Sequence, residues 1–220
     1  MIILPNFNDP FSYENGFYLT CEPGRIGKFL AHYELFKMAS AIPGAIVECG
    51  VFKGASLARF AIFRELFPKI RNRQIVGFDM FGPFPETSFE PDQEHRTKFV
   101  DSAGLESIGV EQLMNVLKHK HCDHDVELVA GNICNTVPEF VERNPNIEIS
   151  LLNLDTDIYE PAVTILENLY PRLKPGGVLI LDDYNVFPGE TKAVDEYFAG
   201  QNIVIRKFDF AATPCYIVKP

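Results

Sequence analysis

The feature of this sequence that most constrains its fold is a series of short apolar runs separated by segments that read as helices. Five such runs occupy residues 45–51, 74–81, 126–131, 149–154 and 178–181. The first run is too uniformly apolar for a half-exposed strand, and its length fits a strand buried in a parallel sheet. Residues 54–66 and 161–173 are the clearest helical segments between runs. This alternation predicts an α/β fold with a doubly wound, mostly parallel, Rossmann-like sheet covered by helices on both faces.

The C-terminal part of the chain departs from this alternation. Residues 203–208 and 215–218 read as strands on either side of a short loop that contains Pro214. A connection of this length does not hold a crossover helix, so we expect an antiparallel hairpin at the end of the chain.

The length of 220 residues corresponds to about one domain, so we expect a single domain over residues 1–220. Two proline-containing stretches, 1–30 and 82–125, do not fit the alternation of strands and helices. We expect the first to be an N-terminal arm or lid and the second to be an insertion that also serves as a lid.

Composition and charge narrow the classes of partner. Hydrophobic residues make up 46% of the chain, enough for a packed core. The formal net charge of -10 would repel the phosphates of nucleic acid. The five cysteines lack CxxC spacing, and no apolar run approaches the roughly 20 residues of a membrane helix. We therefore expect a cytoplasmic protein with a small-molecule partner and no membrane contact, while homo-oligomer formation stays open.

The first run ends in a pair of glycines. Gly50 would permit a tight turn, and Gly54 would allow a close approach at the start of the following helix. The central glycine of a dinucleotide-binding fingerprint is absent, which weakens a pyrophosphate-binding interpretation. The second run ends near Asp79, whose carboxylate could accept both hydroxyls of a ribose. The alternatives are ordinary turn chemistry for the glycines and a solvated or helix-capping role for Asp79.

Aspartates also follow the fourth and fifth runs. If these strands are neighbours, Asp155 and the Asp182-Asp183 pair meet at one edge of the sheet. Three carboxylates at close range repel one another unless a cation lies among them, and an oxygen-only ligand set favours a hard ion such as Mg²⁺. The alternative is a set of acidic loops that point apart into solvent.

These residues belong to a longer pattern. It comprises Glu48-x-Gly50-x-x-x-Gly54, Asp79, Leu154-Asp155-x-Asp157-x-Tyr159-Glu160, LYPRLKPGG at 169–177, LDDY at 181–184, Gly189 and AVDEYF at 193–198. The pattern resembles the macrocin O-methyltransferase family of class I S-adenosylmethionine-dependent enzymes, over roughly residues 44–200. Its most specific part is the segment 155–198. The resemblance implies a class I methyltransferase fold and methyl transfer from S-adenosylmethionine to a hydroxyl of a sugar or related natural product, with a divalent metal, usually Mg²⁺.

The resemblance also implies roles for individual residues. The cofactor-binding set would be Glu48, Gly50, Gly54, Ser56, Asp79, Asn132 and Asp155, with the first three at the methionine part and Asp79 at the ribose. The metal ligands would be Asp155, Asp182 and Asp183. Where catechol-type relatives carry a catalytic lysine, this chain has Ile158. The proton acceptor must then be Asp155, Asp157 or a hydroxide on the metal.

Other clusters admit a functional and a structural interpretation. His119, His121, Cys122 and His124 could bind a transition metal or simply form a polar helix end. His95, Arg96 and Lys98 could meet an acidic acceptor or lie on a solvated face. The aromatic residues of the N-terminal arm could line an acceptor pocket or pack the arm; they are Phe7, Phe11, Tyr13, Phe17 and Tyr18. Cys49, within a buried run, is expected to be a core residue.

Two other functions compete with methyl transfer. An NAD-type oxidoreductase would share the sheet, but the missing central glycine and the acidic edge speak against it. A non-catalytic module that binds the nucleoside cofactor would explain the absence of the lysine at position 158.

Overall fold

The computed structural model describes residues 2–220 and contains one mixed sheet. Over these residues the strand order is β3-β2-β1-β4-β5-β7-β6. The strands are β1 (Ala45–Cys49), β2 (Ile75–Asp79), β3 (Val126–Ala130), β4 (Ile149–Leu154), β5 (Leu173–Leu181), β6 (Arg206–Lys207) and β7 (Cys215–Val218). Strands β1 to β5 pair in parallel, and β7 is antiparallel to both β5 and β6. The predicted doubly wound sheet with a C-terminal antiparallel hairpin is confirmed.

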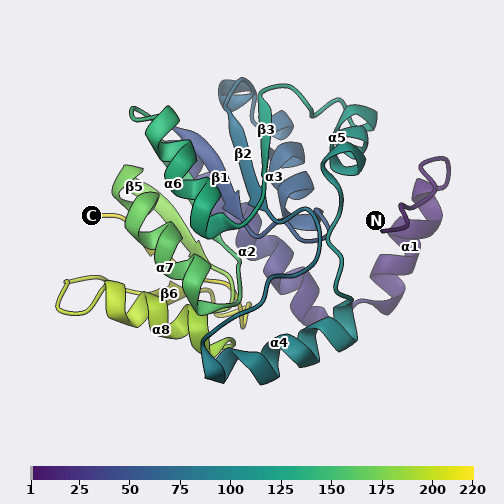
Figure 1. Cartoon of the computed structure of the whole chain (residues 1–220). Helices are drawn as coiled ribbons and strands as arrows, with labels where there is room; N and C mark the ends of the chain where they lie inside the picture. The colour runs from purple at the N-terminus through teal and green to yellow at the C-terminus, as the bar shows by residue number, and fades with distance from the viewer. Residues whose placement is uncertain (1) are drawn as a thin grey trace.

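Helices cover both faces of this sheet (Figure 1). They are α1 (Pro10–Thr20), α2 (Pro23–Ser40), α3 (Ala55–Leu66), α4 (Glu90–Ala103), α5 (Val110–His119), α6 (Ile133–Arg143), α7 (Tyr159–Asn168) and α8 (Pro188–Tyr197), with short 3-10 turns at Pro68–Ile70 and Tyr170–Arg172. One buried cluster joins the sheet to α2, α3 and α5, and another joins it to α6, α7 and α8. Along β1 the side chains alternate between the two clusters, with Ile46 in the first and Val47 in the second. A strand buried on both faces explains its continuous apolar sequence.

Three predicted elements differ in extent. The expected helix 161–173 ends at Asn168, because Pro171 disfavours helical geometry in the residue before it and a 3-10 turn follows. The Lys-Pro-Gly-Gly segment that follows belongs to β5, where Gly176 N–H donates to Lys219 O at 2.8 Å. The expected strand 203–208 shortens to the two residues of β6. Strand β3 is only half-buried, because it is an edge strand.

The two expected lids are unlike each other. Helix α1 contributes no buried residue, whereas α2 starts within the arm 1–30 and continues into the core through Ala31, Leu35 and Phe36. Within 82–125, α4 buries only Asp92, while α5 packs on the sheet through Leu113 and Leu117. The part of the insertion outside the apolar core is therefore the segment 82–107, since Ile108 already belongs to the core. None of the helices within residues 2–220 has the length and apolar composition needed to span a membrane.

Helix α3 offers a matched test of this packing. Leu57 is fully buried between the helix and the sheet, whereas Leu66 on the same helix is 65% exposed. We expect Leu57→Ala to lower the free energy of unfolding by about 2–5 kcal/mol, because it leaves a cavity in the core. Leu66→Ala should change it by about 0.5 kcal/mol or less. Urea denaturation measures both, and equal effects would contradict the assigned core face.

Candidate active site

A cavity of about 980 Å³ opens at the carboxyl ends of the parallel strands. Its wall is built by the segments that follow each of the parallel strands β1 to β5, by the α1–α2 junction and by the segment 82–107. This is the position at which open α/β sheets bind ligands. Most of the predicted site residues line it, namely Gly50, Ser56, Asp79, Asn132, Asp155, Asp157, Asp182 and Asp183. Gly54 lies between the lining residues Lys53 and Ala55, and Glu48 lies two residues before Gly50, but neither is part of the wall.

The turn after β1 requires glycine for two reasons. Gly50 has a φ of +95°, and a Cβ there would lie 1.6 Å from the carbonyl oxygen of Asp155. Gly54 has a φ of +82° at the start of α3. A side chain at Gly50 would push apart the backbones of two loops that both line the cavity.

Asp79 holds this turn in place. Its Oδ2 accepts the backbone N–H groups of Val51 at 3.0 Å and Phe52 at 2.9 Å. Its Oδ1 accepts from the N–H of Phe81 at 2.6 Å and from Ser107 Oγ at 2.9 Å. Both oxygens are therefore engaged with the protein itself, and binding of a ribose by Asp79 stays a prediction. The bond from Ser107 ties the end of the 82–107 segment to the sheet.

Glu48 is a carboxyl group buried beneath the cavity wall. Asn153 Nδ2 donates to its Oε1 at 3.1 Å, while Oε2 is buried and has no hydrogen-bond partner. Burial raises the pKa of Glu48 to about 8, against the opposing effects of Ser56 and Asn153. An orphaned buried carboxyl oxygen next to Ser56 suits a cationic group such as the α-ammonium of an amino acid.

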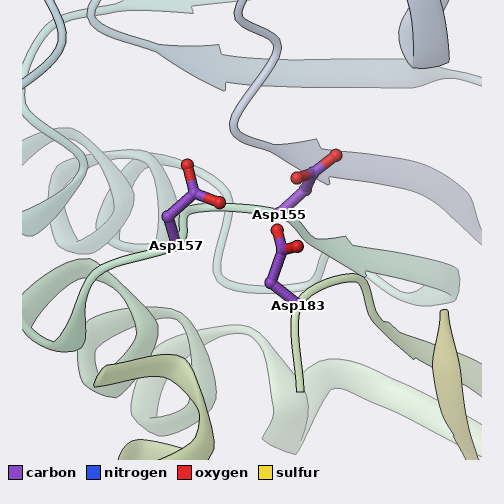
Figure 2. Close-up of side chains that lie close together, drawn as sticks. All are labelled: Asp155, Asp157 and Asp183. Carbon is purple, nitrogen blue, oxygen red and sulfur yellow. The ribbon is translucent and has the colours of Figure 1, made fainter. Parts of the chain in front are cut away.

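Three aspartates gather where β4 and β5 end (Figure 2). Asp155, Asp157 and Asp183 each offer a carboxylate oxygen, and these oxygens all lie within 4.8 Å of one another. Asp157 reaches the cluster from a left-handed backbone with a φ of +63°, which is costly for a residue other than glycine. No ion pair to a basic side chain is formed by any of the three in the described chain. This donor set fits a hard divalent cation.

Burial is the main reason why the pKa values of these three aspartates are raised. It raises the pKa of Asp157 to about 7 and lifts the pKa of Asp155 well above its ordinary value, where the charge of Asp182 adds to the effect. The pKa of Asp183 is likewise raised by burial and by the charges of Asp157 and Asp182. In the absence of a cation, burial therefore favours the protonated form of all three carboxyl groups.

Asp182, predicted as the third metal ligand, lines the same cavity but is not one of the three clustered residues. Its carboxylate contacts Lys28 Nζ of α2, and His32 Nε2 lies 3.3 Å from its other oxygen. Burial favours the protonated acid, but Lys28 and His32 outweigh that effect and hold the pKa of Asp182 well below its ordinary value. The structure therefore groups Asp157, rather than Asp182, with Asp155 and Asp183. The ligand role of Asp182 stays a prediction.

Sequence reasoning missed the basic side of the site. Arg59 of α3 lies 3.0 Å from His32 Nδ1, so a chain of contacts runs from Arg59 through His32 to Asp182. Lys28 and His32 are four residues apart on α2 and thus share one helical face, which is the signal that could have identified them. Their partner Asp182, which directly follows β5, lies about 150 residues away in sequence, and nothing local indicated it.

Glu190 was also missed. It is fully buried in the first turn of α8, and its Oε1 accepts the N–H of Asp183 at 3.0 Å while Oε2 has no partner. Burial raises its pKa, and the charge of Asp183 adds to the effect. Its sequence neighbourhood suggests only an acidic residue at a helix start.

The remaining clusters take structural positions. His119 stacks on Phe7 at 4.7 Å, His124 contacts Glu65 at 3.3 Å, and Cys122 is buried. Arg96 donates to the carbonyl groups of Phe84 and Pro85 and thus ties α4 to the start of the segment 82–107. Lys98 pairs with Glu94, and His95 packs near Phe187. Among the aromatic residues of the N-terminal arm, Phe17 lines the cavity, whereas the side chains of Phe11, Tyr13 and Tyr18 are exposed. Cys49 is fully buried, which confirms its core assignment.

Comparison with known proteins agrees with this geometry. The chain is 31% identical over 156 residues to the 8-demethyl-8-(2,3-dimethoxy-alpha-L-rhamnosyl)-tetracenomycin-C 4'-O-methyltransferase of Streptomyces olivaceus, covering 68% of this chain and 56% of that relative. It is 31% identical over 177 residues to the demethyldecarbamoylnovobiocin O-methyltransferase of Streptomyces niveus, covering 77% and 61%. The chain therefore spans less than two thirds of the length of these relatives.

A solved structure extends the similarity over nearly the whole chain. The calicheamicin methyltransferase CalS11 superposes with a TM-score of 0.78 at 26% identity, covering 97% of this chain and 86% of that protein. The family profile described as macrocin-O-methyltransferase (TylF) matches residues 30–213. This match confirms the resemblance stated from the sequence motifs and favours a methyltransferase over the oxidoreductase alternative. The chain belongs to the macrocin-O-methyltransferase (TylF) family.

Proposed function

We propose that this protein is an S-adenosylmethionine-dependent O-methyltransferase that methylates a hydroxyl of a sugar or related small-molecule natural product, assisted by a divalent cation. Family membership supports the reaction class. The name of the Streptomyces olivaceus relative, which refers to a rhamnosyl group, supports a sugar acceptor. The observation that carries the proposal is a carboxylate cluster and a glycine turn that line one cavity.

The cofactor would lie against the turn after β1. S-adenosylmethionine, when bound, supplies a methyl group on a positively charged sulfur. The unpartnered Oε2 of Glu48 would accept a hydrogen bond from the ammonium of its methionine part. Gly50 and Gly54 would leave room for a close approach, while Ser56, Asp79, Asn132 and Asp155 would provide polar groups around the rest of the molecule. Asp79 would do so indirectly, by fixing the turn.

The divalent cation, Mg²⁺ or another hard ion, would be held by Asp155 and Asp183. These two residues belong both to the ligand set implied by the resemblance and to the cluster. A bound cation supplies positive charge that favours loss of the acceptor's proton. Asp182 can join this set only when Lys28 releases its carboxylate, since the two side chains are in contact.

Asp157 is the residue that we propose as the proton acceptor. The acceptor hydroxyl would give its proton to a carboxylate oxygen of Asp157 while its own oxygen forms the new bond to the methyl carbon. The bond between that carbon and the cofactor's sulfur would break at the same time, and S-adenosylhomocysteine would leave with the electron pair. A pKa of about 7 suits a general base that works near neutral pH. Asp155 is the less suitable base, because it is also one of the two proposed ligands of the cation.

The cysteines and the net charge bear on the compartment and the class of partner. All five cysteines are free, which supports a reducing compartment, and we propose the cytoplasm. The formal charge of -10 supports a small-molecule partner rather than nucleic acid.

Substitution of the proposed base tests the reaction directly. We expect Asp157→Asn to lower kcat by about 10²- to 10⁴-fold, because an amide cannot accept the proton. The rate of the unmodified enzyme should rise with pH up to about 7, because Asp157 loses its proton over that range. The rate of the variant should not show this rise. Transfer of a labelled methyl group from S-adenosylmethionine to a panel of glycosylated natural products measures both. Retained cofactor binding with no transfer to any acceptor would instead favour the non-catalytic module.

Glu48 governs cofactor affinity in this proposal. In the free protein Glu48 holds a proton below about pH 8, and that proton must leave before the carboxylate pairs with an ammonium. The affinity for S-adenosylhomocysteine should therefore increase as pH rises towards 8, with proton release to the buffer. Glu48→Gln should abolish both effects and weaken binding by about tenfold or more. Calorimetry in two buffers of different ionisation enthalpy measures both the affinity and the proton release, and Glu139→Gln, at an exposed position, serves as the control. If the affinity of Glu48→Gln for S-adenosylhomocysteine still rises with pH, the assignment of Glu48 is wrong.

The carboxylate cluster predicts a metal-linked gain in stability. Mg²⁺ should raise the free energy of unfolding of the unmodified protein, because it binds the folded cluster and offsets the repulsion between carboxylates. Asp183→Asn should lose most of this gain, and exposed Asp209→Asn should keep it. Thermal unfolding with and without Mg²⁺ measures the effect. If Mg²⁺ stabilises Asp183→Asn as much as the unmodified protein, the cluster is not the metal site. The same comparison for Asp157→Asn and Asp182→Asn identifies the third ligand.

A further inference from the structure

One carboxylate in the lid segment is buried although its helix is otherwise polar and exposed. Asp92 is the buried residue of α4, and its side chain is fully shielded from solvent. Burying a carboxylate costs free energy unless its oxygens are hydrogen-bonded. Its partners therefore show what α4 is anchored to.

Both oxygens of Asp92 accept hydrogen bonds from the starts of two other helices. Oδ2 accepts the N–H of Tyr159, the first residue of α7, at 2.9 Å. Oδ1 accepts the N–H of Gly189, in the first turn of α8, at 2.7 Å. Such first-turn N–H groups lack partners within their own helices, and the positive ends of both helix dipoles favour an anion there.

These two helices directly follow the loops that carry the acidic site. Tyr159 lies two residues after Asp157, and Gly189 lies six residues after Asp183. The neighbouring Glu190 reinforces the junction, because its N–H donates to Asp157 O at 3.3 Å and its Oε1 accepts from Asp183 N–H. Asp92 thus clamps the ends of both acidic loops to the lid.

Gly189 explains why this clamp can close. A Cβ at Gly189 would lie 1.9 Å from Asp92 Oδ2 and 2.5 Å from the backbone nitrogen of Tyr159. A larger residue would therefore expel the carboxylate.

A second contact joins the same segment to the same helix. Glu160, in the first turn of α7, accepts the N–H of Ser88 at 2.7 Å and the hydroxyl of Thr87 at 2.9 Å. Between these contacts and the end of α4, Phe99 and Ala103 form part of the cavity wall. The lid segment is thus fastened at the rim that carries the carboxylates.

We infer that Asp92 is a positioning residue that couples closure of the lid segment 83–103 to the placement of Asp157 and Asp183. When the lid docks, its carboxylate fixes the starts of α7 and α8 relative to each other, and the two acidic loops take their working geometry. The catalytic consequence rests on the proposed function, whereas the coupling itself is a property of the fold.

Asp92→Asn tests this coupling, because an amide keeps one acceptor oxygen but turns an N–H group towards the second donor. We expect hydrogen exchange in residues 83–103 and at the starts of α7 and α8 to become at least about tenfold faster. We expect kcat per folded molecule to fall by about tenfold or more, with affinity for S-adenosylhomocysteine within about twofold. Asp101→Asn, exposed on the same helix, is the matched control.

Gly189→Ala provides a second route to the same defect. It should reproduce the exchange pattern of Asp92→Asn, and the double variant should show less than the sum of the two effects. The inference is wrong if Asp92→Asn shows the same hydrogen exchange and the same kcat as Asp101→Asn. It is also wrong if the activity that Asp92→Asn loses is fully explained by the fraction of its molecules that is unfolded. If the unmodified protein methylates no acceptor, the proposed function fails, and the exchange data alone still decide the coupling.

Discussion

The constraint on which the site depends is the burial of several carboxyl groups at one edge of the sheet with too few basic side chains to pair with them. Glu48, Asp155, Asp157, Asp183 and Glu190 all have raised pKa values, and burial is the largest cause for each. Among the carboxylates after β4 and β5, Asp182 has a basic partner, supplied by α2. Glu190 accepts a backbone N–H and Glu48 accepts from Asn153, whereas Asp155, Asp157 and Asp183 form no ion pair with a basic side chain among residues 2–220. Burial without such a partner favours the protonated form of each carboxyl group, which is why the pKa values are raised.

The parts of the fold that could be predicted are those in which burial of a strand leaves a continuous run of apolar residues in the sequence. Strands β1, β2 and β4 are buried on both faces and therefore read as continuous apolar runs. The start of β5 was not predictable, because the Lys-Pro-Gly-Gly segment has the composition of a turn and becomes a strand only by pairing with residues near the C-terminus. Tertiary pairing overrode local preference there.

The acidic half of the site could be predicted because topology brings the ends of neighbouring parallel strands together. Its basic half could not, since Lys28 and His32 come from a helix whose relation to β5 is set by packing alone. Asp79 shows a different limit. Its position was expected, but its hydrogen bonds to the Val51 and Phe52 backbone depend on the shape of a turn that sequence does not specify.

The close approach of Gly50 to the Asp155 carbonyl has a consequence for how such an enzyme can diversify. Two loops whose main chains approach this closely cannot lengthen without separating the glycine turn, which is the proposed cofactor site, from the carboxylate cluster. Insertions that adapt the enzyme to new acceptors are better tolerated in 82–107 and in the N-terminal arm, which border the same cavity from outside the sheet. Under the proposed function, the residues that carry the chemistry and those that select the acceptor would therefore lie in separate stretches of polypeptide, one of fixed length and the other free to vary.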